Sequence, residues 1–269
     1  MDIYNDLKKY CYNLTRFYFR LSELRHSNDY SLRQIKEKMK EQPKEGIGRS
    51  LFIILNGPSM KKQNLLSLKG EDLMFVNRGF MHPLYKELQP KYHVFVDGKL
   101  ANGVWDIKWI DQIFEMCPKI KIILPIKWYT NPTFSKYKDD SRIYWQYKCI
   151  PFYSSGVSTS CFSYGIHQKF DNIFFTGFDG NGCAFDMINA SEKSHFYGAD
   201  PELVSMSARQ HATALYRTYL QLMDLCGIAS YCKNKGIKIY NLTDGGILDM
   251  FIRRDFNDPF NAEKEIAPR

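Results

Sequence analysis

The sequence predicts an α/β protein built around a doubly wound, mostly parallel β-sheet. Three observations lead to this fold class. Short apolar runs recur along the chain, and most of them end at a polar residue or a glycine. Stretches with helical spacing of apolar residues separate many of these runs. Strands that alternate with helices form parallel sheets, because each parallel connection must cross over the sheet.

Composition limits the classes of function. The 269 residues suffice for one large α/β domain or two small ones. The formal net charge of +8 indicates acidic partners such as nucleotides, nucleic acid or an anionic membrane surface, although solubility explains it equally well. The sequence has no RNA-binding signature and no basic helix with interleaved aromatic residues, so nucleic acid is not an expected partner.

The cysteines and the apolar stretches indicate the compartment. The seven cysteines are odd in number and contain no Cys-x-x-Cys pair, which is typical of reduced thiols and not of a disulfide framework or a zinc site. No stretch reaches the roughly 18 apolar residues of a membrane span, and residues 1–6 are too polar for a signal peptide. The expected location is the cytoplasm, and a peripheral contact with the inner membrane stays open.

Residues 1–48 are expected to form an N-terminal helical extension. A second helix of this extension is predicted over residues 32–41, before Pro43. We expect the extension to pack on the sheet or on another subunit, and a membrane-surface role is less favoured because acidic residues interrupt the polar face. Apolar residues of its first part recur at steps of three and four, as in an amphipathic helix: Leu7, Tyr10, Leu14, Phe17, Leu21 and Leu24.

Residues 49–250 are expected to form the main domain, and residues 251–269 a charged C-terminal tail whose last residues are poorly ordered. Helices are predicted over residues 60–68, 157–168 and 203–235. The predicted strands lie within residues 51–55, 73–77, 92–97, 119–125, 143–146, 172–179 and 237–243. The fifth is the weakest, and the last is expected to close the series.

The first predicted strand ends in a corner with the sequence Asn56-Gly57-Pro58-Ser59. A strand, a tight turn and a helix N-terminus would follow one another here, with Ser59 as the helix cap. Such a corner directs backbone N–H groups toward a ligand and favours phosphate. A plain strand-to-helix connection is the alternative, since turn residues occur at every turn.

Polar residues end five of the predicted strands. Ligands of doubly wound sheets bind beyond the carboxyl ends of the strands. We therefore expect one polar crevice lined by the residues at these ends, which are Asn56, Asn77, Asp97, Asp179 and Asn241.

Two further segments have the composition of ligand-binding turns. Residues 154–160 open a helix with small hydroxylated residues, and either Ser154 or Ser155 is expected to cap it, with a phosphate site as the alternative to a plain cap. Residues 176–182 contain three glycines, among them Gly177, which let the backbone turn tightly or approach a ligand. Their spacing matches neither the dinucleotide fingerprint nor the Walker phosphate loop.

The loop over residues 184–200 is long and has little secondary-structure signal, which is typical of a lid. His195 within it is a candidate general base because the imidazole titrates near neutral pH. An exposed loop histidine without a role is the alternative. His82 and His93 are interpreted as structural, and His211 as a surface or packing residue of the last helix.

Together these motifs resemble those of the bacterial sialyltransferases that decorate lipooligosaccharides, and of related uncharacterised and pterin diphosphokinase-like proteins. The resemblance covers about residues 50–250, and no single motif is specific to it. The motifs that carry it are, in order, Ile-Leu-Asn-Gly-Pro-Ser, Val-Asn-Arg, Phe-Val-Asp, Ser-Ser-Gly-Val, Thr-Gly-Phe-Asp, Ala-Phe-Asp, Ser-His-Phe-Tyr-Gly and Lys-Ile-Tyr-Asn-Leu.

The resemblance implies an inverting, Rossmann-like glycosyltransferase of lipopolysaccharide biosynthesis, with a lid at about residues 183–202 and no metal or other cofactor. The implied donor is a CMP-activated sialic acid, the acceptor is a glycan or glycolipid, and a homo-oligomer stays open. His195 corresponds to the catalytic base. Asp97 and Tyr197 are candidates for contacts with the acceptor or the leaving group. The residues expected to bind the nucleotide are Asn56, Gly57, Ser59, Asn77, Ser155, Gly156, Gly177 and Asp179.

The chain also departs from the family pattern. Phe152 stands where the family has an arginine, and Asp97 where it has an asparagine. The two tyrosines that hold the departing phosphate fall near Gly180 and Cys183. Two alternatives therefore stay open. One is a Mg-ATP-dependent diphosphokinase with its metal on Asp97 and Asp179, and the other is a non-catalytic nucleotide-binding protein.

Overall fold

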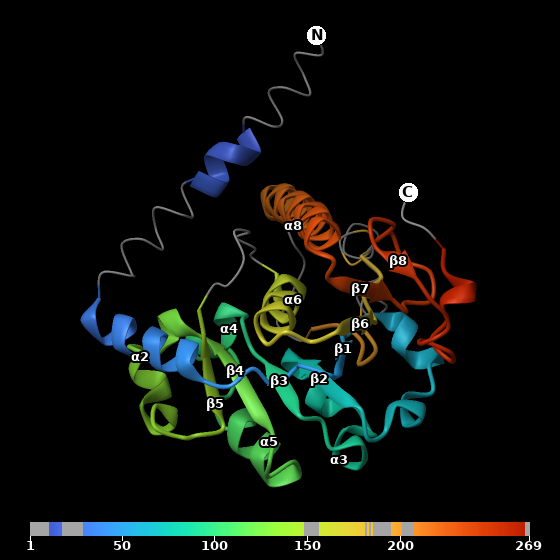
Figure 1. Cartoon of the computed structure of the whole chain (residues 1–269). Helices are drawn as coiled ribbons and strands as arrows, with labels where there is room; N and C mark the ends of the chain where they lie inside the picture. Colours follow the sequence, from blue (N-terminus) through green and yellow to red (C-terminus); the bar gives the residue numbers. More distant parts are fainter. Residues whose placement is uncertain are drawn as a thin grey trace.

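A computed structural model describes residues 11–17, 29–147, 156–180, 182, 184, 195–200 and 207–266. Its centre is an eight-stranded sheet in the order β5-β4-β3-β2-β1-β6-β7-β8, in which every neighbouring pair is parallel (Figure 1). Helices flank the sheet, as in a Rossmann-like doubly wound fold, and the predicted fold class is confirmed.

The strands follow the apolar runs of the sequence closely. Their bounds are β1 Ser50–Ile54, β2 Asp72–Val76, β3 Tyr92–Val94, β4 Lys121–Pro125, β5 Ile143–Gln146, β6 Asn172–Thr176, β7 Lys238–Asn241 and β8 Ile252–Arg253.

The order of the strands creates a switch point at the centre of the sheet. From β1 to β5 each strand is added on the same side of its predecessor, and the chain then returns so that β6 pairs with the other side of β1. The connections on the two sides of β1 therefore run in opposite directions. The carboxyl ends of β1 and β6 border the crevice in which doubly wound folds bind their ligands.

Helices cover both faces of the sheet. α6 and α8 lie on one side, and α3 and α5 lie on the other (Figure 1). The longest helix, α8, begins with a capping box formed by Ser207 and Gln210 and ends at Gly236 in the left-handed conformation. The α-helices are α2 Tyr30–Glu41, α3 Tyr85–Leu88, α4 Gly98–Ala101, α5 Trp109–Met116, α6 Val157–His167 and α8 Ala208–Lys235.

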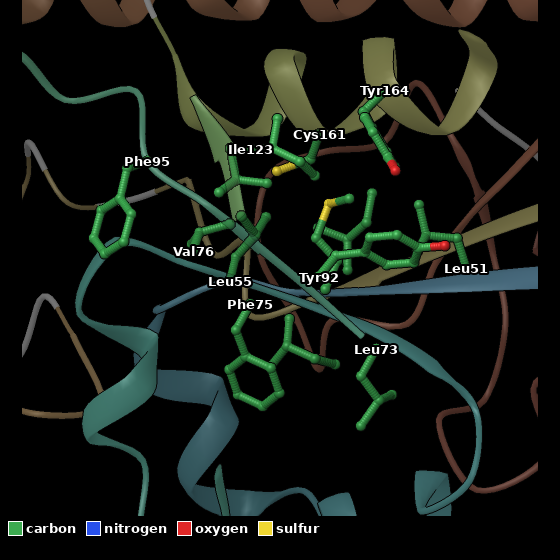
Figure 2. Close-up of a cluster of buried hydrophobic side chains, with 14 of the residues drawn as sticks. Leu51, Leu55, Leu73, Phe75, Val76, Tyr92, Phe95, Ile123, Cys161 and Tyr164 are labelled. Carbon is green, nitrogen blue, oxygen red and sulfur yellow. The ribbon is translucent and has the colours of Figure 1, made fainter. Parts of the chain in front are cut away.

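The core lies on both faces of the central strands. Cys161 and Tyr164 of α6 project toward one face, and Leu73 and Phe75 lie on the other side of the strands (Figure 2). Aromatic rings stack across neighbouring strands, with the Phe52 and Phe174 ring centroids 4.7 Å apart. Burial on both faces explains why these strands are continuously apolar and do not alternate.

The helix predicted over residues 60–68 is wrong. Two short 3₁₀ helices, η1 Pro58–Lys62 and η2 Leu65–Leu68, stand in its place. Leu65 and Leu68 are three residues apart and both buried, which suits the three-residue repeat of a 3₁₀ turn. Ser59 is not a helix cap either, because it lies inside η1 and its hydroxyl donates to Asp179.

The expectation that residues 237–243 form the last strand is also wrong. β8 follows them, pairs in parallel with β7, and is joined by an antiparallel bridge between Arg253 and Ile266. Phe251 and Phe256 on either side of β8 are buried. A two-residue strand has no periodicity that the sequence could reveal. The end of the chain, residues 267–269, lies outside the described residues.

Two parts of the N-terminal extension are described. α2 buries Leu32, Ile35 and Met39 and packs along the edge strand β5. Residues 11–17 are helical, and Tyr12 donates a 2.8 Å hydrogen bond to the buried Asp224 of α8. Leu7, Tyr10, Leu21 and Leu24 of the predicted apolar stripe lie outside the described residues, and Leu14 and Phe17 are exposed.

The division of the chain into an extension, a main domain and a tail stays a prediction. In the described parts of the chain, no helix combines the length and the apolar character that crossing a bilayer requires.

Candidate functional site

The loops that follow β1 and β6 meet at the switch point. The Gly57 amide donates a 2.8 Å hydrogen bond to the Gly177 carbonyl, and the Leu55 amide donates a 2.9 Å bond to Thr176. Gly177 has a φ of 73°, and a Cβ atom at this position would lie 2.5 Å from the Leu55 carbonyl oxygen. Glycine is therefore required here both for its backbone conformation and for the close approach of the two loops.

Asp179 joins the two loops through its side chain. Its Oδ2 atom accepts hydrogen bonds from the Ser59 amide at 3.3 Å and from the Ser59 hydroxyl at 3.1 Å. Burial raises the pKa of the Asp179 carboxyl, and the bonds from Ser59 oppose that effect. A Cβ atom on Gly57 would overlap this carboxylate. Gly57, Ser59 and Asp179 thus contact one another, and a nucleotide contact from any of them stays a prediction.

The loop after β7 packs against the segment that carries Asp179. The Thr243 hydroxyl accepts a 3.3 Å hydrogen bond from the Phe178 amide. The Arg253 guanidinium of β8 donates to the carbonyls of Thr243, Gly245 and Gly246 and holds this loop in shape. Since a two-residue strand such as β8 has no signal in the sequence, the sequence alone does not connect Arg253 with the site.

The predicted convergence of five strand ends is wrong for Asn241. This side chain is buried, donates a 3.0 Å bond to the Leu248 carbonyl and accepts a 2.9 Å bond from the Thr243 amide. An asparagine at a strand end often closes its own turn in this way. Asn241 therefore shapes the loop after β7 and does not line the crevice.

Asn56 and Asn77 end the neighbouring strands β1 and β2. The Asn56 amide nitrogen donates a 3.2 Å hydrogen bond to the Val76 carbonyl, which ties the two strand ends together. The Oδ1 atoms of both asparagines are buried and have no hydrogen-bond partner within the described part of the chain. Buried acceptors are normally paired, so two unpaired ones at adjacent strand ends indicate a place for ligand donors.

His93 holds the turn at Asn77 through a hydrogen bond to its main chain. The Asn77 carbonyl accepts a 2.9 Å hydrogen bond from His93 Nε2, so Nδ1 accepts from the Tyr85 hydroxyl. Burial lowers the pKa of His93 to about 3, which keeps the imidazole neutral. Asn77 has a φ of 47°, which is uncommon for a residue other than glycine. The structural role predicted for His93 is confirmed.

Asp97 follows β3 and serves as the N-cap of α4. Its carboxylate accepts a 3.0 Å hydrogen bond from the Lys99 amide. The helix it caps, Gly98–Ala101, brings Lys99 to the same edge of the sheet. A contact between Asp97 and an acceptor or leaving group stays a prediction.

The segment of residues 195–200 lies over the ends of β1 and β2. The Phe196 amide donates a 2.9 Å hydrogen bond to the Asn56 carbonyl, and the Phe196 ring lies 5.2 Å from the His82 ring. The His195 and Tyr197 rings stack with centroids 4.9 Å apart and planes 19° apart. The structure therefore brings the candidate base next to Asn56, although the two are far apart in sequence.

Asp200 at the end of this segment is anchored to the sheet edge. Its Oδ1 atom accepts a 3.1 Å hydrogen bond from the Tyr197 hydroxyl and lies 3.3 Å from Arg78 Nε. Its Oδ2 atom lies 3.5 Å from Lys99 Nζ. The Arg78 guanidinium lies over the Trp105 and Trp109 rings, 5.4 and 5.1 Å from their centroids.

These anchoring residues were not singled out from the sequence. Arg78 directly follows Asn77 at a strand end, where a charged turn residue is ordinary. Trp105 and Trp109 are four residues apart, which is a weak signal for one aromatic surface. Asp200, the partner of Arg78, lies more than 120 residues further along the chain, so only the fold shows the connection.

The N-terminus of α6 is partly covered by α8. Gly156 is the N-cap residue and makes no side-chain cap. A Cβ atom on Gly156 would overlap the side-chain amide of Gln221, which donates a 3.3 Å hydrogen bond to Ser158. Phe152, Ser154 and Ser155 lie outside the described residues, as does most of the predicted lid. The expected cap and phosphate contact at Ser155 stay predictions.

The Phe196–Asn56 bond thus places His195 and Tyr197 near the end of β1, and Asn77 ends the neighbouring strand β2. The group of Gly57, Ser59, Gly177 and Asp179 lies on the other side of this point, where β6 pairs with β1. The residues that the structure describes include no group of three or more His, Cys, Asp or Glu side chains placed to hold a metal ion.

No family model and no curated protein sequence matches the chain. The functional proposal therefore rests on the residues of the chain itself.

Proposed function

We propose that the chain is an inverting, metal-independent glycosyltransferase that moves an acidic, sialic acid-like sugar from a CMP-sugar to a cell-surface glycan acceptor. The observation that carries the proposal is the hydrogen bond from the Phe196 amide to the Asn56 carbonyl. Through it His195, which corresponds to the catalytic base in the family that the motifs resemble, lies beside the switch point where doubly wound sheets bind ligands.

The asparagines support a nucleotide as the ligand. The buried Oδ1 atoms of Asn56 and Asn77 need hydrogen-bond donors, and leaving a buried acceptor unpaired costs about 1–3 kcal/mol. A cytidine nucleotide carries an exocyclic amine and ribose hydroxyls that would satisfy them. The phosphate is proposed to bind at the N-terminus of α6, where Gly156 is the N-cap residue and Ser155 directly precedes it in the sequence.

The proposed reaction is a direct displacement. The neutral His195 imidazole takes the proton of an acceptor hydroxyl, and the acceptor oxygen forms a bond to the anomeric carbon of the donor sugar. The bond from this carbon to the phosphate oxygen breaks, and CMP leaves with the electron pair. Attack from the face opposite to CMP inverts the configuration. Asp97 and Tyr197 stay candidates for contacts with the acceptor or with the departing phosphate.

The geometry favours this reaction over a Mg-ATP-dependent diphosphokinase that uses Asp97 and Asp179. These residues follow β3 and β6, which are separated by β2 and β1. Three inter-strand spacings of about 4.8 Å place the two strand ends about 14 Å apart. Magnesium binds oxygen ligands at about 2.1 Å, so a shared ion would require both carboxylates to turn toward each other across this gap. Asp179 is moreover bonded to Ser59.

The first test compares ligands and then turnover. CMP without metal should raise the thermal midpoint of the purified protein, because a ligand that binds only the folded state stabilises it. A shift only with ATP and magnesium would instead support the diphosphokinase. Release of CMP from CMP-sialic acid in the presence of a glycan acceptor then measures transfer, and it should persist in EDTA.

The His195→Ala variant tests the assigned base. General-base catalysis contributes about 10²- to 10⁴-fold, so turnover should fall by that factor while CMP still shifts the thermal midpoint. His211→Ala, on the half-exposed first turn of α8, is the matched control and should retain turnover. Full turnover in His195→Ala contradicts the assignment. Binding of CMP without any turnover by the natural sequence supports a non-catalytic nucleotide-binding protein.

A further inference from the structure

A series of side-chain contacts connects the His195 ring to the edge of the sheet. His195 stacks on Tyr197, the Tyr197 hydroxyl donates to Asp200, and Asp200 lies between Arg78 and Lys99. The series begins on the segment of residues 195–200 and ends on the 3₁₀ helix η3 (Asn77–Met81) and on α4, which follow β2 and β3. It therefore connects the candidate base to the rigid edge of the sheet.

We propose that Asp200 and Tyr197 are positioning residues, which hold the imidazole of His195 in the orientation needed to accept a proton. This inference rests on the proposed function, because it assigns a role to residues around the proposed base. Neither residue needs to touch the reacting atoms in this role. Tyr197 was a candidate for a ligand contact, and the geometry points to its stacked ring as its main contribution.

The main chain alone does not fix the ring. The Phe196 and Gly198 amides donate to the carbonyls of Asn56 and His195, and these bonds hold the backbone of the segment. These backbone bonds leave the side-chain torsion angles of His195 to be set by the groups that contact its ring. The Tyr197 ring lies nearly parallel to the imidazole, and its hydroxyl is bonded to Asp200. A ring held in this way restricts the rotation of the His195 side chain.

The far end of the series is well fixed. The Arg78 side chain is 10% exposed and the Asp200 side chain 12% exposed, so both are largely shielded from water. Trp105 and Trp109 lie against the Arg78 guanidinium and limit its movement. Ion pairs in such surroundings are screened less than surface pairs. Asp200 can therefore act as a fixed acceptor for the Tyr197 hydroxyl.

Such positioning matters because proton transfer is sensitive to distance. A general base must lie within about 2.6–3.2 Å of the group from which it takes a proton. A displacement of about 1 Å can cost about a hundredfold in rate. A series of contacts that orients the imidazole before substrate binds would thus contribute to kcat and leave donor binding nearly unchanged.

The experiment compares Tyr197→Phe and Asp200→Asn with the natural sequence. Tyr197→Phe keeps an aromatic ring and removes one oxygen, whereas Asp200→Asn keeps an acceptor and removes the charge. Tyr30→Phe and Asp139→Asn are matched controls, because both residues are exposed and lie on α2 and before β5. Circular dichroism and thermal midpoints establish that each variant folds.

The first measurement needs no substrate. The chain has six histidines, so the imidazole C–H signals of His195 can be assigned by NMR through the His195→Gln variant. Stacking on Tyr197 shifts these signals upfield through the ring current. We expect both variants to lose most of this shift and both controls to keep it. An unchanged shift in both variants overturns the positioning role, whatever their activity.

The second measurement is the kinetics of CMP release. Both variants should lower kcat about tenfold to a hundredfold and change the donor KM by less than about twofold. A rise in KM with unchanged kcat overturns positioning and supports a direct contact with the donor. If the NMR shift is lost but His195→Ala retains full turnover, the contacts around His195 are as described and the proposed function fails instead.

Discussion

Gly57 is the residue whose substitution best tests the packing of the switch point. Its φ is −63°, so the backbone itself tolerates a side chain. A Cβ atom would nevertheless overlap the Asp179 carboxylate and lie 2.5 Å from the Gly177 carbonyl oxygen. Gly57→Ala should therefore lower the free energy of unfolding by about 1–3 kcal/mol, the usual cost of overpacking. Urea denaturation measures this loss.

Gly98→Ala is the matched control at the same edge of the sheet. The nearest atom to a Cβ at position 98 is 3.8 Å away, and the residue lies in α4, where alanine is the better helix former. Its stability should equal or slightly exceed that of the natural sequence. If Gly57→Ala is as stable as Gly98→Ala, the contact between Gly57 and Asp179 is looser than the structure indicates.

At the scale of elements, a buried carboxylate connects the helical residues 11–17 to α8. Asp224 accepts a hydrogen bond from Tyr12 and pairs with Arg16 at 3.1 Å. We expect Tyr12→Phe and Asp224→Asn to be non-additive in a double-mutant cycle, with a coupling of about 1 kcal/mol, because the residues share one network. Chemical denaturation of the four proteins measures it. Additive effects would show that Tyr12 and Asp224 do not interact energetically.

The elements also show how much the sequence could reveal. Seven strands could be predicted because buried parallel strands are continuous apolar runs. The helices α6 and α8 could be predicted because residues with helical spacing extend over long stretches of the sequence. β8 was missed because two residues carry no period. The helix over residues 60–68 is predicted from the turn after the first strand and from Ser59 as its cap, whereas the buried Leu65 and Leu68 lie in a 3₁₀ turn.

Some residues of the candidate site could likewise be predicted from the sequence, and others could not. Asn56 and Asn77 could be predicted because the ends of parallel strands meet at one edge. The contacts of Asp200 with Arg78 and Lys99 could not, because they depend on how a distant segment folds back over the sheet. The mutual contacts of Gly57, Ser59 and Asp179 were invisible for the same reason, since turn residues look alike whether they bind a ligand or one another.

At the scale of the whole molecule, the buried His93 and the half-buried His167 make stability depend on pH. Burial lowers the pKa of His93 to about 3, and burial together with the nearby Lys44 ammonium lowers the pKa of His167 to about 4. His167 Nε2 lies 2.9 Å from both Lys44 Nζ and the Tyr147 hydroxyl. Because a lysine ammonium only donates, the neutral imidazole must accept, and protonation would end that bond.

The sign of the pH effect follows from these lowered values. Between the ordinary histidine pKa of about 6.5 and the folded values, the unfolded chain binds more protons, so the free energy of unfolding falls as pH falls. Each histidine contributes a slope of about 1.4 kcal/mol per pH unit in that window. Urea denaturation from pH 7.5 to 4.5 should show this loss. The free energy of unfolding of His167→Gln should fall less steeply with pH. Carboxyl groups that titrate in the same range contribute equally to both proteins, so subtracting one curve from the other removes their contribution. Equal slopes would mean that His167 is protonated in the folded protein, contrary to its contact with Lys44.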